Sequence, residues 1–420
     1  MSFPTRQSIQ HRIQQGVNRR LKGFTTPYDL TEFSDIDPNE SAAANPDIVE
    51  NIWQRQQAFY RCGMHPFTSL AIRHKGELIF NRSIGHAQRS LHTLEGSIVG
   101  NVNTPVGLFS ASKPVSALLV HKLAEQGLVN LLSPISDYLP EFGQNGKEKV
   151  SLYQMLSHRS GFAFIDQDID PNIIVDLDAV FELICELPCA NPDGRVQAYH
   201  GVTSGFVIAK LIQKLTGKTI REYLDQEIRQ PMGMLNFDYG YRDTADTPVA
   251  YNYNTGGPRL SPFVDHLTRT LGIRFEDIVE LSNMPNFHNS VLPSGNAYGT
   301  AEEVSRFYQM LLNGGNWQGT PIFQEQTIKI AAQEVSGARI DRALILPMRY
   351  SPAFMLGGSP VGMYGKSSHN AFGHLGLSNV ISFADPDRDL AVALMTTGKP
   401  VIGSHLIEFV RLLNAITTDF

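Results

Sequence analysis

The two ends of the chain carry matching patterns of short apolar runs separated by turn residues. Near the start, the runs Thr68–Arg73 and Glu77–Ser83 have strand length and flank Lys75-Gly76, which predicts a β-hairpin. Near the end, Asn379–Ala384 and Leu390–Thr396 flank a turn rich in Asp, which predicts a second hairpin. The two ends are therefore expected to supply strands to one sheet.

A helical pattern lies beside each hairpin. Asp47 is a candidate N-cap for a helix that ends near Gly63, and its predicted inner face carries Ile48, Ile52, Gln56 and Phe59. The last helix is predicted over His405–Ile416, and its predicted buried side chains are Leu406, Phe409, Val410 and Leu413. We expect an antiparallel β-sheet flanked by N- and C-terminal helices.

The stretch between the hairpins has mainly helical spacing. Helices are predicted over Ser110–Gln126, Thr203–Leu215 and Ala301–Leu312, and Gly217 suits the position after the second. The expected fold class is α/β of the α+β type, with an inserted, mainly helical domain. The predicted parts are a polar N-terminal extension at 1–47, a sheet domain at 48–145 and 290–420, and the inserted helical domain at 146–289.

The composition of the 420 residues, 42% hydrophobic and 18% charged, is that of a globular protein. The net charge of −6 comes from interspersed residues, and the one small basic cluster is expected to be a solvated helix face, so no nucleic-acid partner is predicted. That cluster consists of Arg12, Arg19, Arg20 and Lys22.

The N-terminal residues carry no apolar stretch of the secretory type, and no apolar run approaches the roughly 18 residues of a membrane span. Cys62, Cys185 and Cys189 form no CxxC pair, which favours free thiols over a disulfide framework or a zinc site. Free thiols are typical of a reducing compartment, so a cytoplasmic protein is expected. The sequence leaves the oligomeric state open.

The candidate chemistry begins at Ser110-Ala111-Ser112-Lys113, where Lys113 is the only lysine with a serine three positions before it. Residues three apart share a helix face, so Ser110 Oγ and Lys113 Nζ can meet. Backbone amides at a helix start suit an oxyanion, and burial there would lower the pKa of Lys113 enough to supply a neutral base. An isolated SxxK is more often an N-cap beside a surface lysine. The later motifs therefore decide whether this pair is interpreted as catalytic or as structural.

Those motifs follow in a fixed order after Ser110-x-x-Lys113: Leu156-Ser157-His158-Arg159-Ser160-Gly161, Ala198-Tyr199-His200-Gly201, Pro293-Ser294-Gly295 and Gly373-His374-Leu375-Gly376. Over residues 50–415 the series resembles the superfamily of serine β-lactamases and penicillin-binding proteins, particularly class C β-lactamases and family VIII esterases. The resemblance implies a serine β-lactamase-like fold. It also implies that Ser110 is the acylated nucleophile and that Lys113 accepts or relays its proton. Tyr199 would activate Ser110 as a phenolate or through a proton shuttle with Lys113.

Where β-lactamases carry a Lys-Thr-Gly motif, this chain has His374-Leu375-Gly376. By analogy, the amides of Ser110 and Leu377 would form the oxyanion hole, and Gly376 would let substrate approach the strand. His374 would hydrogen-bond the substrate or the Tyr199 oxygen, or else be structural. Lys366-Ser367-Ser368 is interpreted as a chance likeness to the missing motif.

Glycine also replaces the asparagine of the β-lactamase Tyr-x-Asn motif, so groups that bind the amide and the carboxylate of a β-lactam are both missing. The expectation is a carboxylesterase that needs no metal or cofactor and acts on a small-molecule ester or amide. The alternatives are a transacylase, an amidase or D-amino-acid peptidase with weak β-lactamase activity, and a non-catalytic penicillin-binding-like scaffold. Substrate choice is expected to depend on the loops Phe162–Asp176 and Asn252–Phe275.

Overall fold

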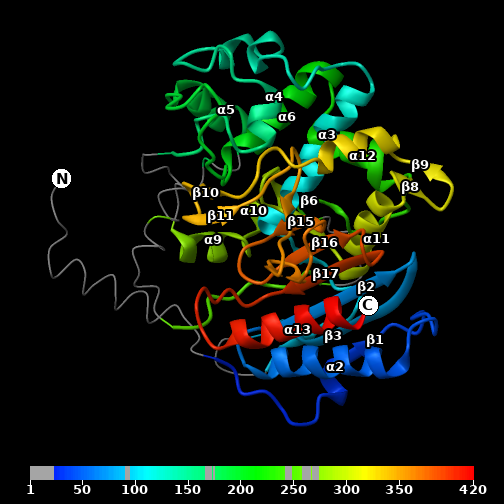
Figure 1. Ribbon diagram of the computed structural model, residues 1–420. Coiled ribbons are helices and arrows are strands. Elements are labelled where there is room, and N and C mark those ends of the chain that lie inside the picture. Colours follow the sequence, from blue (N-terminus) through cyan, green and yellow to red (C-terminus); the bar gives the residue numbers. More distant parts are fainter. Residues whose placement is uncertain are drawn as a thin grey trace, which may run out of the picture.

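The computed structural model describes residues 23–89, 95–165, 173, 176–241, 248–257, 266 and 274–420. The predicted basic cluster before residue 23 lies outside these ranges, and so does much of both predicted specificity loops. Figure 1 shows a sheet in the lower half of the view, covered by helices on both faces, with a mainly helical region above it.

The sheet joins strands from the two ends of the chain, in the order β1-β3-β2-β17-β16-β15-β12, with β4 also paired to β3. The strands are β1 (Ser34–Ile36), β2 (Phe67–His74), β3 (Glu77–Gln88), β4 (Ile98–Val99), β12 (Met355–Leu356), β15 (Phe372–Leu375), β16 (Ile381–Asp385) and β17 (Leu390–Thr396). Every pairing is antiparallel, and β2 lies directly against β17. Both predicted hairpins and the antiparallel sheet are confirmed.

The first hairpin turns where the sequence predicts. Lys75 and Gly76 both have positive φ, 52° and 86°. Two central residues with positive φ are the signature of a type I′ turn, whose twist matches that of the flanking strands.

Helices from both termini cover one face of this sheet. α2 (Pro46–Arg61) and α13 (His405–Asp419) pack together over an apolar layer that contains Ile52, Phe59, Ile72, Val392 and Leu412. α11 (Ala301–Leu312) covers the opposite face, against β2, β16 and β17 (Figure 1). The layered arrangement predicted from the sequence is therefore confirmed.

Two details of the terminal helices differ from the prediction. Asn45, not Asp47, caps α2, because its side chain accepts a 2.9 Å bond from the Asp47 amide and Pro46 fits the first turn. On α13, Leu406 and Val410 are 37% and 50% exposed. Leu413 is buried and Phe409 is partly buried, as predicted, and His405, Leu412 and Ile416 complete the buried face.

The predicted N-terminal extension contributes to the sheet. β1 lies within residues 1–47 and pairs with β3, with Ser34 opposite Ile84. Glu40 accepts hydrogen bonds from the guanidinium of Arg82 at 2.8–3.2 Å, which fastens the segment after β1 to the same strand. The segment before α2 thus contributes a strand to the sheet, and the other domain boundaries stay a prediction.

The helical region holds α4 (Leu152–Leu156), α5 (Leu177–Glu186), α6 (Thr203–Thr216) and α7 (Ile220–Leu224). Gly217 ends α6 with φ +70°, as predicted. α3 (Lys113–Glu125) is buried along most of its length and packs against α6, so it joins the sheet to the helical region.

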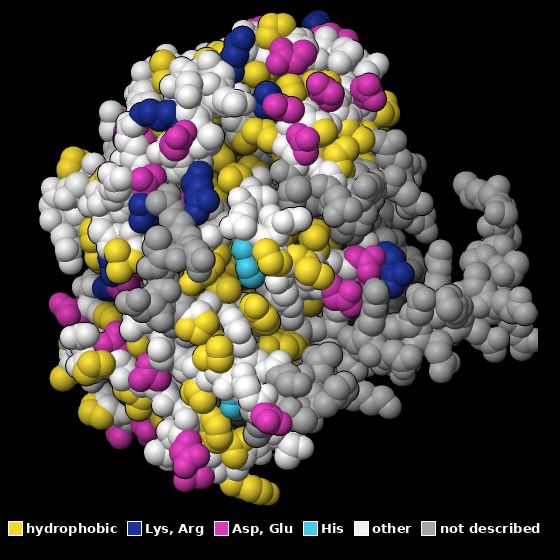
Figure 2. Space-filling model, turned by 180° about the vertical axis from the view of Figure 1, so that it is seen from behind, with side chains coloured by type: hydrophobic (Ala, Val, Ile, Leu, Met, Phe, Trp, Pro, Cys, Tyr) yellow, Lys and Arg dark blue, Asp and Glu magenta, His cyan; other side chains and the backbone are white. Residues whose placement is uncertain are grey.

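On the face drawn in Figure 2, acidic and basic side chains are scattered among apolar ones, as the interspersed sequence charges predict. Among the described residues, the helices include none with the length and apolar character that a bilayer span requires.

Candidate active site

Ser110 lies in a tight turn that leads into α3. Residues Phe109–Ser112 form a 3₁₀ turn, and the α-helix begins only at Lys113, three residues later than predicted. Pro114 suits the first turn of that helix because it has no amide to leave unbonded. Side chains three apart eclipse each other in a 3₁₀ turn, which brings Ser110 and Lys113 together more directly than an α-helix would. Phe109 has φ +50°, a conformation that non-glycine residues seldom adopt.

Lys113 is hydrogen-bonded to Ser110 and to a second, backbone acceptor. Its Nζ lies 3.1 Å from Ser110 Oγ and donates a second 3.1 Å bond to the carbonyl oxygen of Ser294. The side chain is buried, and this burial lowers the pKa of Lys113 from 10.5 to about 7. A neutral amine is therefore accessible near neutral pH, beside the hydroxyl that it would deprotonate.

Tyr199 completes this group from the segment before α6. Lys113 Nζ lies 4.8 Å from the centre of the Tyr199 ring. Burial raises the pKa of Tyr199 above its usual 10, which the nearby Ser110 side chain opposes and Asp341 reinforces. The hydroxyl is buried and has no hydrogen-bond partner of good geometry within the described structure. Tyr199 is thus a neutral phenol at rest, which favours the proton shuttle over the resting phenolate.

His374 lies on β15, beside Tyr199, with 5.9 Å between the ring centres. Its Nδ1 is 2.6 Å from the carbonyl oxygen of Leu375, so Nδ1 carries the proton and Nε2 is an acceptor. Burial, helped by the nearby Lys113 charge, lowers the pKa of His374 to about 3. Nε2 is buried without a hydrogen-bond partner in the described ranges. The ring is therefore a neutral acceptor, whereas the lysine of the β-lactamase motif is a cation.

The candidate oxyanion amides belong to Ser110 and Leu377, and both residues line one pocket. Neither amide donates a hydrogen bond to any described residue. Gly376 precedes Leu377, and a Cβ there would overlap the carbonyl oxygen of Leu108, just before the Ser110 turn. Packing within the protein thus already requires glycine, whereas the sequence suggested only a close approach of substrate.

The pocket beside Ser110 has a volume of about 50 Å³ and a mainly apolar lining. Its large apolar side chains are Phe109, Val202, Ile278, Leu281, Phe287, Leu292 and Leu377. Such a lining suits the hydrocarbon part of an acyl group.

Two supporting residues were not predicted. Asp341 is buried, and its carboxylate accepts bonds from the amides of Tyr199, Ala343 and Leu344 at 2.8–3.1 Å. Its other oxygen accepts from the Tyr350 hydroxyl at 3.1 Å. Ser294 was noted only as part of a motif, yet its carbonyl oxygen holds Lys113. A backbone acceptor leaves no mark on residue type, and a lone Asp outside any motif carries no signal either.

His158 and His65 bond to backbone groups. His158 Nδ1 accepts from the His200 amide at 3.1 Å, and His65 Nδ1 lies 3.1 Å from the carbonyl oxygen of Gly398. Within the described ranges, His, Cys, Asp and Glu side chains form no group of three that could hold a metal ion.

A family model described as Beta-lactamase matches residues 57–415, most of the chain. The chain belongs to the β-lactamase family. Among curated proteins, it is 24% identical to Esterase/beta-lactamase LipL of Mycobacterium tuberculosis over 385 residues, which are 84% of this chain and 85% of that protein.

Solved structures share the fold of this β-lactamase-family chain. A penicillin-binding protein homologue from Caulobacter crescentus has a TM-score of 0.78 and 24% identity, covering 92% of this chain and all of that chain. A family VIII carboxylesterase also has a TM-score of 0.78, with 20% identity and the same coverage. Each likeness extends across both the sheet and the helical region.

Proposed function

We propose that this protein is a serine hydrolase that cleaves carboxylic esters through an acyl-enzyme on Ser110. The observation that carries the proposal is the Lys113 amine, which lies 3.1 Å from Ser110 Oγ and has a pKa of about 7. About half of such amines are neutral at pH 7, so the base needs no further activation. The curated relative named as an esterase and β-lactamase supports this reaction class.

Acylation begins when the Lys113 lone pair takes the Ser110 hydroxyl proton. The Oγ then attacks the ester carbonyl carbon, and the electron pair of the C=O bond moves to oxygen. The amides of Ser110 and Leu377 would stabilise that oxyanion by two hydrogen bonds. Their lack of other partners among the described residues supports this role.

Tyr199 passes the proton onward. The electron pair on the oxyanion re-forms the C=O bond, and the bond from carbon to the alcohol oxygen breaks. Tyr199 gives its phenolic proton to the departing alkoxide and takes the proton that Lys113 received from Ser110. The acyl-enzyme and the free alcohol result, and no group is left charged that was neutral before. In deacylation, water loses a proton by the reverse route and attacks the acyl carbon. The bond from this carbon to Ser110 Oγ then breaks, the acid leaves, and Ser110 Oγ regains the hydrogen. The elevated pKa of Tyr199 supports a relay in which the phenol is neutral between transfers.

The substrate class follows from the charges of the site. His374 is neutral, and glycine at position 201 has no side-chain amide to bind a β-lactam. The apolar pocket beside Ser110 favours a hydrocarbon acyl group. We infer an uncharged ester with a short or medium acyl chain, and β-lactam turnover well below ester turnover.

The test uses p-nitrophenyl acetate, butyrate and octanoate, together with intact-mass detection of a fluorophosphonate adduct. We expect turnover and one adduct for the unmodified protein, and neither for Ser110→Ala. The matched control is Ser112→Ala, because Ser112 Oγ donates to the Phe109 carbonyl oxygen and accepts from the Ala297 amide. That variant should keep the adduct on Ser110. Full ester turnover by Ser110→Ala would refute the mechanism.

The other outcomes select the alternatives. An adduct with little turnover, relieved by added alcohol or amine, indicates a transacylase. Faster cleavage of D-amino-acid amides than of esters indicates an amidase. If the protein shows neither an adduct nor turnover, the result indicates the non-catalytic scaffold.

A cytoplasmic location is part of the proposal. It is supported by the three thiols, which are free, and by Cys189 Sγ, which donates to the Ser160 carbonyl oxygen at 3.2 Å. Such thiols are typical of reducing compartments.

A further inference from the structure

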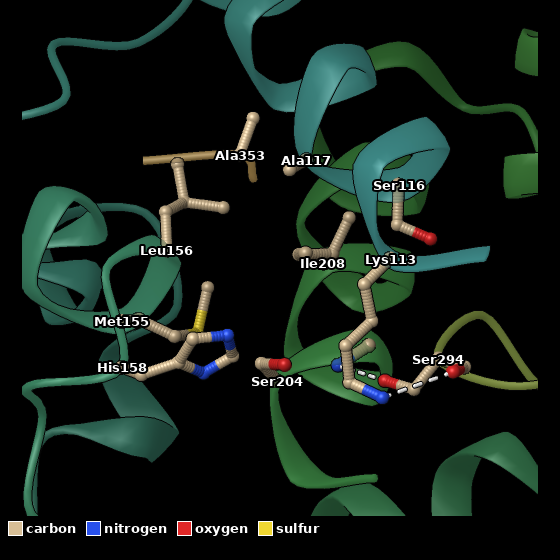
Figure 3. A pocket seen from close by; sticks show the side chains of 11 residues that line it. Lys113, Ser116, Ala117, Met155, Leu156, His158, Ser204, Ile208, Ser294 and Ala353 are labelled. Atoms are coloured by element: carbon tan, nitrogen blue, oxygen red, sulfur yellow. Dashed lines mark hydrogen bonds between the residues drawn. The ribbon is translucent and has the colours of Figure 1, made fainter. Parts of the chain in front are cut away.

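A second pocket, distinct from the one that Ser110 lines, lies against Lys113 between α3, α4 and α6. Its volume is about 20 Å³, which suits one water molecule. Figure 3 shows His158, Ser204 and Lys113 on its walls, with Ser204 between the other two. The apolar part of the lining comes from Ala117, Met155, Leu156, Ile208 and Ala353, and Ser116, Gly205 and Ser294 complete it.

His158 is held in one orientation and one protonation state. Its Nδ1 accepts from the His200 amide, so the proton of the neutral ring is on Nε2. The ring packs between Tyr199 and Tyr350, with ring centres 4.9 and 4.7 Å away. Burial holds the pKa of His158 well below 6.5, so the ring stays neutral. Nε2–H is therefore a fixed donor, and it has no acceptor among the described residues.

Ser204 is a second polar group that needs a partner. It is 6% exposed, and its hydroxyl forms no hydrogen bond within the described structure. Ser204 Oγ and His158 Nε2 both keep some accessible surface, so a water molecule in the pocket can reach and bond to them. Two such groups on one small pocket beside an amine form a site for a polar molecule rather than an apolar void.

We propose that this pocket binds one structural water and that His158 and Ser204 are positioning residues for Lys113. The water accepts from His158 Nε2–H, donates to Ser204 Oγ and accepts one N–H from Lys113. These three bonds are the usual number for a buried water. The inference rests on the proposed function, because it assigns this water a role in the same base.

The consequence concerns the direction of the lone pair. A neutral amine has two N–H bonds and one lone pair. The Ser294 carbonyl oxygen takes one N–H, and the water takes the other. The lone pair must then point at the remaining neighbour, Ser110 Oγ, which is the orientation that proton abstraction needs.

The titratable groups near Lys113 come from the neighbouring segments and, apart from one carboxylate, are neutral. His158, His200 and His374 are buried and neutral, and Tyr199 is a neutral phenol. The Asp341 carboxylate accepts a hydrogen bond from the amide of Tyr199. A water that accepts an N–H from Lys113 stabilises the ammonium form, so its loss shifts proton release to lower pH.

The first test measures kcat/KM for p-nitrophenyl butyrate against pH. In Ser204→Ala we expect the plateau to fall about tenfold and the acid limb to move about one pH unit lower, with KM unchanged. Ala353→Val, which fills the pocket and removes no polar group, should show the same two changes. A purely structural role would lower the plateau through unfolding and leave the acid limb in place.

The matched control is Ser305→Ala. Ser305 is a buried helical serine whose hydroxyl donates to the Glu302 carbonyl oxygen, away from both pockets. It should leave the profile unchanged. If the acid limb of Ser204→Ala and of Ala353→Val coincides with that of the unmodified protein, the proposal is wrong.

The second test does not depend on turnover. A high-resolution crystal structure should show density for one water within hydrogen-bond distance of His158 Nε2, Ser204 Oγ and Lys113 Nζ, and none in Ala353→Val. A dry pocket in the unmodified protein overturns the proposal even if the ester reaction is confirmed. Ordered water in a protein without esterase activity would instead refute only the proposed function.

Discussion

Replacing Lys113 with methionine should remove activity and stabilise the fold at neutral pH. The amine has a pKa of about 7 in the folded protein and an ordinary value of 10.5, so folding must release its proton over much of this range. Below about pH 10.5 the unfolded chain binds more protons, and stability therefore rises with pH between about 7 and 10.5. Methionine fills similar space and carries no such requirement.

The size of the effect follows from the same two values. Keeping this amine buried costs about 4 kcal/mol at pH 7 and about 2 kcal/mol at pH 9. Methionine also leaves the Ser294 carbonyl oxygen without its 3.1 Å donor, a loss of about 1–3 kcal/mol that does not depend on pH. We expect Lys113→Met to be about 1–3 kcal/mol more stable at pH 7, an advantage that shrinks by about 2 kcal/mol at pH 9.

Urea unfolding at pH 7 and pH 9 measures this difference, since groups that titrate alike in both proteins cancel. The control is Lys329→Met, because the Lys329 side chain is 64% exposed and pairs only with Glu325 on the surface of its helix. Its stability difference should be the same at both pH values. If the Lys113→Met difference is also independent of pH, the amine is not deprotonated on folding, and its proposed role as a resting base is refuted.

Three further changes test the site. Tyr199→Phe should lower kcat by about 10²–10⁴ with little effect on KM, because a relay is lost while the ring keeps its packing; an unchanged kcat in steady-state assays would exclude the relay. Gly376→Ala should destabilise the protein by about 1–3 kcal/mol in thermal or urea unfolding, because the new methyl group overlaps the Leu108 carbonyl oxygen; normal stability would show that the turn before Ser110 yields easily. Leu281→Trp should lower kcat/KM for the octanoate ester far more than for the acetate ester, because Leu281 lines the pocket beside Ser110; equal losses on both esters would place the acyl chain elsewhere.

Local patterns in the sequence predicted the parts of this fold that local physics determines. The Lys75-Gly76 turn, both hairpins and the Gly217 helix end depend on neighbouring residues, and they lie where expected. The buried face of α13 depends on which side meets the sheet and α2. The helical spacing predicted a buried face of Leu406, Phe409, Val410 and Leu413, and of these Leu406 and Val410 lie exposed.

The candidate site divides in the same way. Ser110 and Lys113 share one sequence motif, and Tyr199 belongs to another. The structure brings these residues together with His374, from a third segment of the chain. The groups that hold them could not be predicted, because a carbonyl oxygen such as that of Ser294 exists at every position. Asp341 and Ser204 are common residue types whose importance comes only from their burial.

The pairing of β2 with β17 has a consequence for how the protein is made. Strand partners such as Ala71 and Ala393 are separated by most of the chain, so the central pairing cannot form until the ribosome has synthesised the last strands. At roughly 5–20 residues per second, the first hairpin waits about 15–60 s for its neighbour. During that time the open edge of β2 is exposed to other nascent chains, so chaperone supply should influence the yield of active protein.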